Sequence, residues 1–172
     1  MSNDWFECKI KYEKTMENGL VKKVSEPYLV DALSFTEAEK RIIDEISPFM
    51  TGEFEVSDIK RAKYAEFFET LEESADKWFK AKLVFITLDE KKGTEKKTSQ
   101  NVLVQSSDLR SAIARLDEGM KNSMMDYTIA SIAETPIMDV FRYKEPVPEF
   151  ASKAPTGERP ETAVQEGGEA QQ

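Results

Sequence analysis

The stretch Trp5-Phe-Glu-Cys-Lys-Ile10 returns 73 residues later as Trp78-Phe-Lys-Ala-Lys-Leu83. In the same way, Gly19-x-x-Lys-Lys-x-Ser25 returns as Gly93-x-x-Lys-Lys-x-Ser99 at an offset of 74. Further apolar positions match at these offsets: Leu29 with Leu103, Val30 with Val104, Ala38 with Ala112, Ile42 with Leu116, Ile46 with Met120, Phe54 with Tyr127 and Val56 with Ile129. Self-similarity at a fixed period is typical of repeated structural units. The sequence therefore predicts a duplicated half-domain with a pseudo-two-fold axis, in which matched surface residues lie side by side.

Each unit begins with a predicted hairpin. Residues 5–14 alternate between two sets of side chains, which is the period of a half-buried strand. Asn18-Gly19 supplies the turn because both residues tolerate positive φ, and a return strand runs over about 20–31. Pro27 lies inside that strand and cannot donate a ladder hydrogen bond, which indicates an edge position or a bulge.

A helix and a third strand complete the first unit. The pattern Ser34-x-x-Glu37 is a capping box that opens a helix. Its apolar stripe comprises Ala38, Ile42 and Ile46. Pro48 and Gly52 end the helix, and a strand that carries Phe54 and Val56 begins near Glu53.

The second unit repeats this order. Its first strand turns four apolar residues inward: Phe79, Ala81, Leu83 and Phe85. Lys91-Lys-Gly93 makes the turn, 94–105 form the return strand, and Asp108 caps the helix. The helix stripe comprises Leu109, Ala112, Leu116 and Met120. The last strand starts with Tyr127 and Ile129 and continues irregularly through Pro136 to Phe141.

These patterns predict an α+β fold of two tandem strand-strand-helix-strand repeats, with mainly antiparallel sheet and two helices packed on it. The repeats cover about 4–68 and 77–141 of a single duplicated domain, 1–146. Residues 147–172 are rich in Pro, Glu, Gly and Gln, and from about 151 they offer almost no apolar anchor. We predict a disordered tail there. It either keeps the protein soluble, or competes with nucleic acid for a basic groove, or recruits other proteins.

Composition excludes several classes of protein. There is no histidine among the 172 residues, which removes Ser-His and Cys-His nucleophiles and any His-containing zinc site. Cys8 is the only cysteine, so no intrachain disulfide can form, and its place in the strand indicates a buried apolar role. No compact acidic motif proposes a magnesium site, and no cofactor is predicted. The N-terminus lacks the features of a signal peptide and no apolar run would span a bilayer, so we expect a cytoplasmic protein without membrane contacts.

The repeated Trp-Lys pattern is the sharpest candidate for a binding surface, although the net charge of −9 argues against nucleic acid as a general partner. The pattern places a tryptophan and two lysines on the strand face opposite the core, once in each unit: Trp5, Lys9 and Lys11, then Trp78, Lys80 and Lys82. Exposed aromatics and lysines on a flat sheet could stack bases and neutralise phosphates. Lys96 and Lys97, with Lys22 and Lys23 as counterparts, add charge near the turns. Alternatively, the tryptophans cover a core edge, and the lysines form a solvated face or protect sheet edges.

Residues 134–141 form an apolar segment after the last repeated pattern. Ile137, Val140 and Phe141 follow Pro136, which indicates a segment that docks on the domain or on a twin chain. Core packing is the favoured interpretation.

Three segments resemble an uncharacterised family, a "domain of unknown function" of Bacteroidetes and the phages that infect them. They are Trp5-Phe-Glu-Cys-Lys9, the stretch from Glu26 to Glu39, and Glu134-Thr-Pro-Ile-Met-Asp-Val-Phe141. The similarity covers about Asp4 to Phe141. It implies a bacterial or phage protein in a replication setting, and it brings no catalytic residue.

We therefore expect a non-enzymatic binding protein for single-stranded nucleic acid, in a replication or recombination context. In this hypothesis the two tryptophans stack bases. Six lysines contact phosphates: Lys9, Lys11, Lys80, Lys82, Lys96 and Lys97. The alternative is a protein-interaction or structural module that acts through homo-oligomerisation. A small-molecule binder using a groove between the repeats is a third possibility, and an enzyme is the least expected class.

Overall fold

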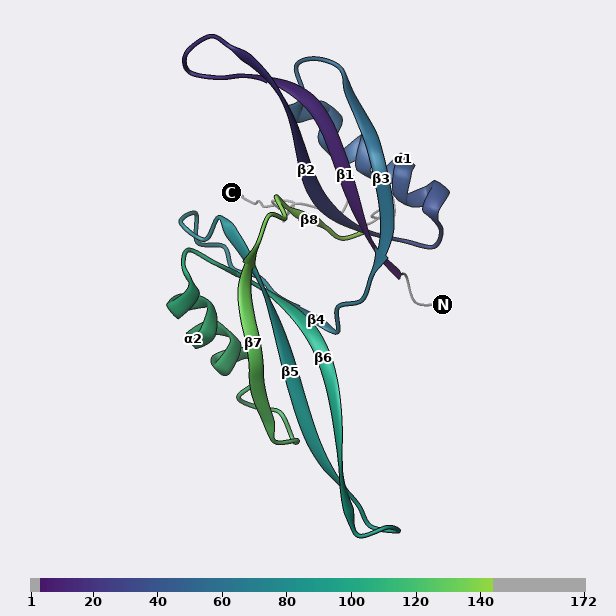
Figure 1. Ribbon diagram of the computed structural model, residues 1–172, viewed down its shortest axis with the longest axis vertical. Coiled ribbons are helices and arrows are strands. Elements are labelled where there is room, and N and C mark those ends of the chain that lie inside the picture. Colours follow the sequence, from purple (N-terminus) through teal and green to yellow (C-terminus); the bar gives the residue numbers. More distant parts are fainter. Residues whose placement is uncertain (1–3, 144–172) are drawn as a thin grey trace, which may run out of the picture.

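The computed structural model describes residues 4–143, which form two four-stranded sheets, each covered by one helix (Figure 1). The first half comprises β1 (Asp4–Thr15), β2 (Val21–Ala32), α1 (Phe35–Ile46), a 3-10 turn η1 (Ser47–Phe49), β3 (Phe54–Ala62) and β4 (Glu66–Phe68). The second comprises β5 (Lys77–Asp89), β6 (Thr94–Ser106), α2 (Leu109–Gly119), β7 (Tyr127–Thr135) and β8 (Val140–Phe141). The predicted α+β class is confirmed. The predicted tail, 147–172, lies outside the described residues.

The order strand, strand, helix, strand occurs twice, as β1-β2-α1-β3 and as β5-β6-α2-β7. Each half then ends in a short strand that joins the other half's sheet. β4 pairs with β6 in parallel, so the second sheet has the order β4-β6-β5-β7. β8 returns to pair with β2 in parallel, and the first sheet has the order β3-β1-β2-β8. The two halves thus exchange edge strands, while their origin by duplication stays a prediction.

Local chemistry explains the hairpins and helix starts. Gly19 and Gly93 occupy the two hairpin turns with φ of 83° and 63°, conformations that glycine adopts without steric cost. The Ser34 side chain accepts a hydrogen bond from the backbone N–H of Glu37 (3.1 Å), and the Glu37 carboxylate accepts from the N–H of Leu33. The predicted cap is confirmed, although its return bond reaches the residue before Ser34. Asp108 caps α2 in the same manner, accepting from Ser111 N–H at 2.7 Å.

Three apolar clusters hold the structure together. One lies between the first sheet and α1, and contains Phe6, Cys8, Ile10, Val30, Ala32, Ala38, Ile42 and Ile46. The second lies between the second sheet and α2, and contains Phe79, Ala81, Leu83, Phe85, Val102, Val104, Ala112 and Leu116. The third joins the two halves, and contains Leu29, Trp78, Leu103 and Ile137, with Trp5, Ala62, Tyr64, Phe67 and Val140 against them. We call this third group the central cluster.

The structure corrects two details of the second unit. Leu109 was expected in the buried stripe of α2 but is 44% exposed, because it is the first residue of the helix and lies beyond the sheet that Ala112 and Leu116 contact. The last predicted strand does not continue to Phe141. It ends at Thr135, and β8 joins the other sheet. Ile137 is buried in the central cluster, which confirms core packing for this segment.

Candidate nucleic-acid interface

The face of each sheet opposite its helix is called here its outer face. Pairing registers define its residues, because side chains that are directly opposite one another across neighbouring strands share a face. Lys9 and Lys11 lie on the outer face of the first sheet. Lys80 and Lys82 lie on the outer face of the second. The predicted faces of these four lysines are therefore correct, and all four side chains are exposed.

Trp78 is not exposed as predicted. It lies on the outer face, but only 3% of its surface is accessible because the central cluster covers this end of the sheet. Trp5 is half-buried in the same cluster, its ring centroid 4.3 Å from that of Phe67, with the Arg142 guanidinium 5.9 Å from its centroid. The two tryptophans join the halves of the molecule, and a base has no access to Trp78.

The outer face of the first sheet neutralises its own charges. Lys9 lies directly opposite Asp58 of β3, and Lys11 lies opposite Glu55. Their neighbour Glu7 lies opposite Lys60 and forms an ion pair with it at 3.3 Å. Glu7, Lys9 and Lys11 therefore each lie opposite a residue of opposite charge on β3, which reduces the attraction of this face for a phosphate.

On the outer face of the second sheet, no carboxylate lies directly opposite a lysine, although Glu95, opposite Leu88, is on this face two residues from Lys97. Lys80 lies between Leu103 and Ala133, and Lys82 lies between Asn101 and Ser131. Further along the hairpin, Lys97 lies opposite Ile86. Among residues 4–143, no ion pair involves Lys80, Lys82 or Lys97, and none involves Lys9 or Lys11, so the two faces differ in the charge opposite each lysine and not in bonded pairs. We call this surface the basic outer face and define it by seven residues: Lys80, Lys82, Val84, Ile86, Lys97, Ser99 and Asn101.

Lys96 does not belong to the basic outer face. It lies opposite Thr87, and so points to the helix side of the β5–β6 hairpin. Since neighbouring residues of a strand face opposite ways, the predicted pair Lys96 and Lys97 cannot contact one ligand on one face. The structure thus brings together Lys80, Lys82 and Lys97, and separates them from Lys96 and from Lys9 and Lys11 of the other sheet.

Lys80 marks the place where the basic outer face meets the central cluster. Its ammonium lies 5.9 Å from the centroid of the Tyr64 ring, a cation–π distance. Burial, together with the nearby charge of Glu7, raises the pKa of Tyr64 to about 12. The phenol stays protonated at neutral pH, so this end of the surface gains no negative charge.

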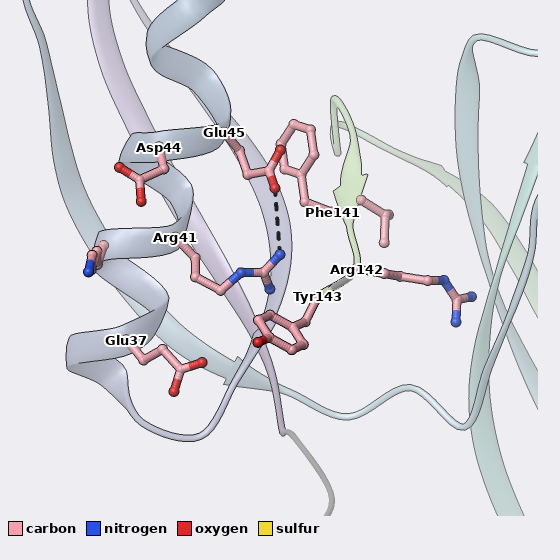
Figure 2. Close-up of a pocket in the computed structure, with 9 residues that line it drawn as sticks. Glu37, Arg41, Asp44, Glu45, Phe141, Arg142 and Tyr143 are labelled. Carbon is pink, nitrogen blue, oxygen red and sulfur yellow. Dashed lines mark ion pairs between the residues drawn. The ribbon is translucent and has the colours of Figure 1, made fainter. Parts of the chain in front are cut away.

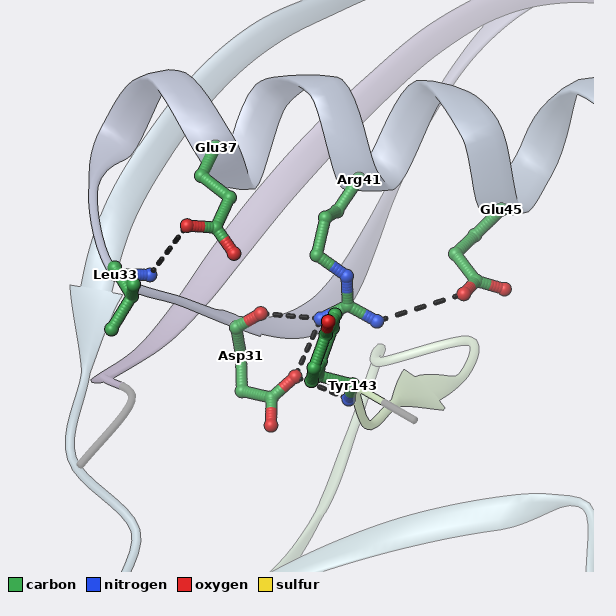
Figure 3. Close-up of polar contacts among 6 residues, drawn as sticks. All are labelled: Asp31, Leu33, Glu37, Arg41, Glu45 and Tyr143. Atoms are coloured by element: carbon green, nitrogen blue, oxygen red, sulfur yellow. Dashed lines mark hydrogen bonds and ion pairs between the residues drawn. The ribbon is translucent and has the colours of Figure 1, made fainter. Parts of the chain in front are cut away.

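A second polar region is an open hollow of about 690 Å³ between α1 and β8 (Figure 2). Its walls carry three acidic and three basic side chains: Glu37, Asp44 and Glu45, with Lys40, Arg41 and Arg142. Arg41 is the centre of a bonded network beside it (Figure 3). Its Nη1 donates to Asp31 Oδ1 at 2.5 Å and to the backbone oxygen of Asp31, while Nη2 lies 3.6 Å from Glu45.

The same network fixes the end of β8. Asp31 Oδ1 also accepts from the backbone N–H of Tyr143 at 2.6 Å, and the Tyr143 ring lies under the Arg41 guanidinium, 5.5 Å away. Arg41 and Asp31 are thus held by structural contacts that tie α1, β2 and β8 together. No group of three or more cysteine, aspartate or glutamate side chains within the described part of the chain is arranged to hold a metal ion.

The structure defines an α+β protein whose two halves exchange edge strands and in which the lysines on the outer face of the second sheet have no carboxylate directly opposite them. The chain belongs to the family described as "Domain of unknown function (DUF4494)", whose model matches residues 4–143. The match includes all the strands and both helices described above, as well as the basic outer face. No curated protein matches the chain. No helix among residues 4–143 is both long and apolar enough to cross a membrane.

Proposed function

We propose that the protein is a non-enzymatic binder of single-stranded nucleic acid, and that it binds through the basic outer face. The observation that carries this proposal is the difference between the two outer faces. The positions opposite Lys9 and Lys11 on β3 are Asp58 and Glu55, whereas β7 presents Ser131 opposite Lys82. Lysines without acidic neighbours attract phosphates even when the chain as a whole is acidic.

The dimensions of the surface support a short single strand. Residues 80–88 of β5 extend for about 27 Å at roughly 3.4 Å per residue. That length suits a site of about four nucleotides or more, as in other single-strand binders. Ser99, Asn101 and Ser131 offer small hydrogen-bonding groups between the lysines. Such groups contact phosphate and sugar without reading the base sequence.

Base stacking contributes little in this proposal. Trp78 is buried, and the exposed apolar residues that continue the outer face along β5 are aliphatic: Ile86 and Leu88. Without an aromatic platform, affinity should be dominated by phosphate contacts and should fall steeply with salt. Binding should also depend little on sequence.

The matched lysines of the two sheets provide the test. Lys82→Gln should weaken binding of a fluorescein-labelled oligo-dT and reduce the slope of log K against log salt by about 0.7, the value for one phosphate contact on a single strand. Lys9→Gln, at the position 73 residues earlier, should change neither quantity because Asp58 already faces Lys9. A wild-type chain with no salt-dependent binding would refute the proposal. Equal losses in both variants would refute the choice of face.

A second candidate function is a protein-interaction or homo-oligomerisation module. The β1–β2 and β5–β6 hairpins extend to opposite ends of the molecule (Figure 1). Both carry exposed apolar residues near their tips, with Leu20 66% and Leu88 67% accessible. Apolar tips of this kind suit contact with another protein. Salt-independent self-association in sedimentation velocity, abolished by Leu88→Ser, would support this candidate over nucleic-acid binding.

We further propose a cytoplasmic location in a bacterial or phage-infected bacterial cell, with a role in replication or recombination. The resemblance of three segments to proteins of Bacteroidetes and their phages supports this setting. Absence of enzymatic activity is part of the same proposal, supported by the lack of histidine in the sequence. Enrichment of single-stranded DNA with the protein, cross-linked in such cells, would test both the location and the ligand.

A further inference from the structure

We propose that the free edge of β7 is an interface between two copies of the chain, in which β7 pairs antiparallel with β7 of the second copy. β7 pairs with β5 on one side only, so its other side is an edge of the second sheet (Figure 1). The backbone groups that point outward from this edge have no hydrogen-bond partner among residues 4–143. Such groups are a template on which another extended strand can pair.

Of the four strands that edge the two sheets, β7 is the long one without charge protection. β4 and β8 contain only three and two residues. β7 carries one charged residue, Glu134, which forms an ion pair with Lys77 of its own chain at 3.5 Å. Charged side chains, lysine above all, keep exposed edges from pairing. β3 has the same length of nine residues as β7 but carries four of them: Glu55, Asp58, Lys60 and Arg61.

The position that favours a second copy as the partner is Ala133. Ala133 lies opposite Lys80, and Lys60 lies opposite Glu7, which is 73 residues before Lys80. Ala133 of β7 therefore corresponds to Lys60 of β3. Two identical antiparallel strands place the residue on their two-fold axis directly opposite its own copy. At Lys60 this arrangement would bring two like charges together, which is destabilising, whereas at Ala133 two small methyl groups meet.

The direction of the backbone groups defines the register of this pairing. The carbonyl of Asn101 accepts a hydrogen bond from the N–H of Ala65, next to β4, at 2.8 Å, so the backbone groups of Asn101 point away from β5. Lys82 lies opposite Asn101, and its backbone groups therefore point away from β6 and toward β7. Alternation along β7 then turns the N–H and C=O of Ile132 and Glu134 to the free edge.

With Ala133 on the two-fold axis, these outward groups find partners. Ile132 lies opposite Glu134 of the second copy, and each of the two such pairs exchanges two backbone hydrogen bonds. On the outer face, Ser131 lies opposite Thr135 of the second copy, a cross-strand pair of hydroxyl side chains. The pairing uses residues 131–135, which follow the register shift in the β5–β7 ladder, so that irregularity does not interrupt it. Five residues from each copy form a small interface, which is typical of transient association.

The dimer joins the two second sheets into one sheet of eight strands. The Lys80 side chains of the two copies then lie on the same face, three strand spacings or about 14 Å apart. One single strand of nucleic acid can therefore cross both basic outer faces. This consequence rests on the proposed function, whereas the pairing of β7 with its copy does not.

Disulfide cross-linking tests the register in the full chain without nucleic acid. The Ala133→Cys chain should form a covalent dimer under mild oxidation, because the two introduced thiols occupy a non-hydrogen-bonded pair whose Cα atoms lie about 4.5 Å apart. Ser131→Cys is the matched control on the same face, and it should cross-link far less because Thr135 lies opposite it. Cys8 is fully buried and does not compete. Equal cross-linking of the two variants, or none at position 133, would overturn the proposal.

Sedimentation velocity without nucleic acid gives an independent readout. Wild type should show a concentration-dependent dimer that persists in Leu88→Ser, whose change lies at a hairpin tip. Ala133→Lys, which introduces the residue found on β3, should remain monomeric at the same concentration, and Thr128→Lys, on the other side of the register shift, should dimerise like wild type. A monomeric wild type would overturn the inference, also where the amides of Ile132 and Glu134 are protected from exchange, since another segment of the chain would then cover the edge. A monomer that binds oligo-dT would overturn this inference alone, and a dimer that does not bind it would overturn the proposed function alone.

Discussion

Alternation along β5 assigns Trp78 to the face opposite α2, and the structure agrees, yet the side chain is buried. A period of two identifies the face of a residue but not whether another layer of the protein covers that face. The covering layer here comes from distant segments, including Leu29 of β2 and Ile137 before β8. Lys82, four residues further along the same face, lies beyond this cover and is exposed. The faces of Lys80 and Lys82 could therefore be predicted from the sequence, whereas the sequence left open whether the tryptophans bind a ligand or cover a core edge, and the structure places them in the central cluster.

Replacement of Trp78 measures how much the central cluster contributes to the free energy of unfolding. Trp78→Ala should reduce the free energy of unfolding by about 3–5 kcal/mol, the usual range for truncation of a buried tryptophan. Lys82→Gln, on the exposed part of the same strand, should change it by no more than about 0.5 kcal/mol. Urea unfolding followed by circular dichroism compares the two variants. A Trp78→Ala chain as stable as wild type would contradict the buried position.

Cys8 gives a pH-dependent prediction. Burial first, then the charges of Glu7, Asp58 and Glu39, raise the pKa of the Cys8 thiol from 9.0 to about 12. In the unfolded chain the thiol ionises near its ordinary pKa, so above pH 9 the unfolded state gains stability that the folded state does not. Between about pH 9 and 12, wild type should therefore lose up to about 1.4 kcal/mol per pH unit more than Cys8→Ala. Parallel pH dependence in the two chains would contradict the raised pKa.

At the scale of elements, local signals predicted the hairpins and helices, and long-range pairing decided the rest. Gly19 and Gly93 mark the turns, and Ser34 and Asp108 cap the helices, because each acts on residues close by in the sequence. β4 and β8 contain only three and two residues, and they pair with strands formed far away in the chain. No periodicity can be recognised over so short a stretch. The exchange of edge strands was therefore absent from the prediction.

The contact between β4 and α2 can be tested at Gly119. A Cβ atom at this position would lie 2.4 Å from the ring of Phe68, too close for any real contact. Gly119→Ala should therefore destabilise the protein by about 1–3 kcal/mol, as overpacking does, although alanine ordinarily favours a helix. Gly52→Ala is the control, because open space surrounds that position. Recovery of stability in the double variant Gly119→Ala, Phe68→Leu would confirm the cause.

At the scale of the whole molecule, the two outer faces show how similar sequences come to differ in charge. Lys9 of β1 matches Lys82 of β5 at the offset of 73, but the residues opposite them, Asp58 on β3 and Ser131 on β7, differ in charge. This difference is present in the sequence as Glu55 and Asp58 against Thr128 and Ser131. It could not be interpreted without the register of the strands, since a slip of one residue would turn those side chains to the other face. The structure supplies that register.

The exchange of edge strands predicts that the two halves unfold together. β4 completes the second sheet and β8 the first, and the central cluster takes residues from both halves. Ile42→Ala, on the buried face of α1, should lower the free energy of unfolding by about 2–5 kcal/mol. Native-state amide exchange should then show the same loss of protection in β5 as in β1. Leu116→Ala, on the buried face of α2, is the reciprocal variant and should reduce amide protection equally in β1 and β5. Loss of protection confined to the mutated half would show that the halves are independently stable and that the short strands are only peripheral additions.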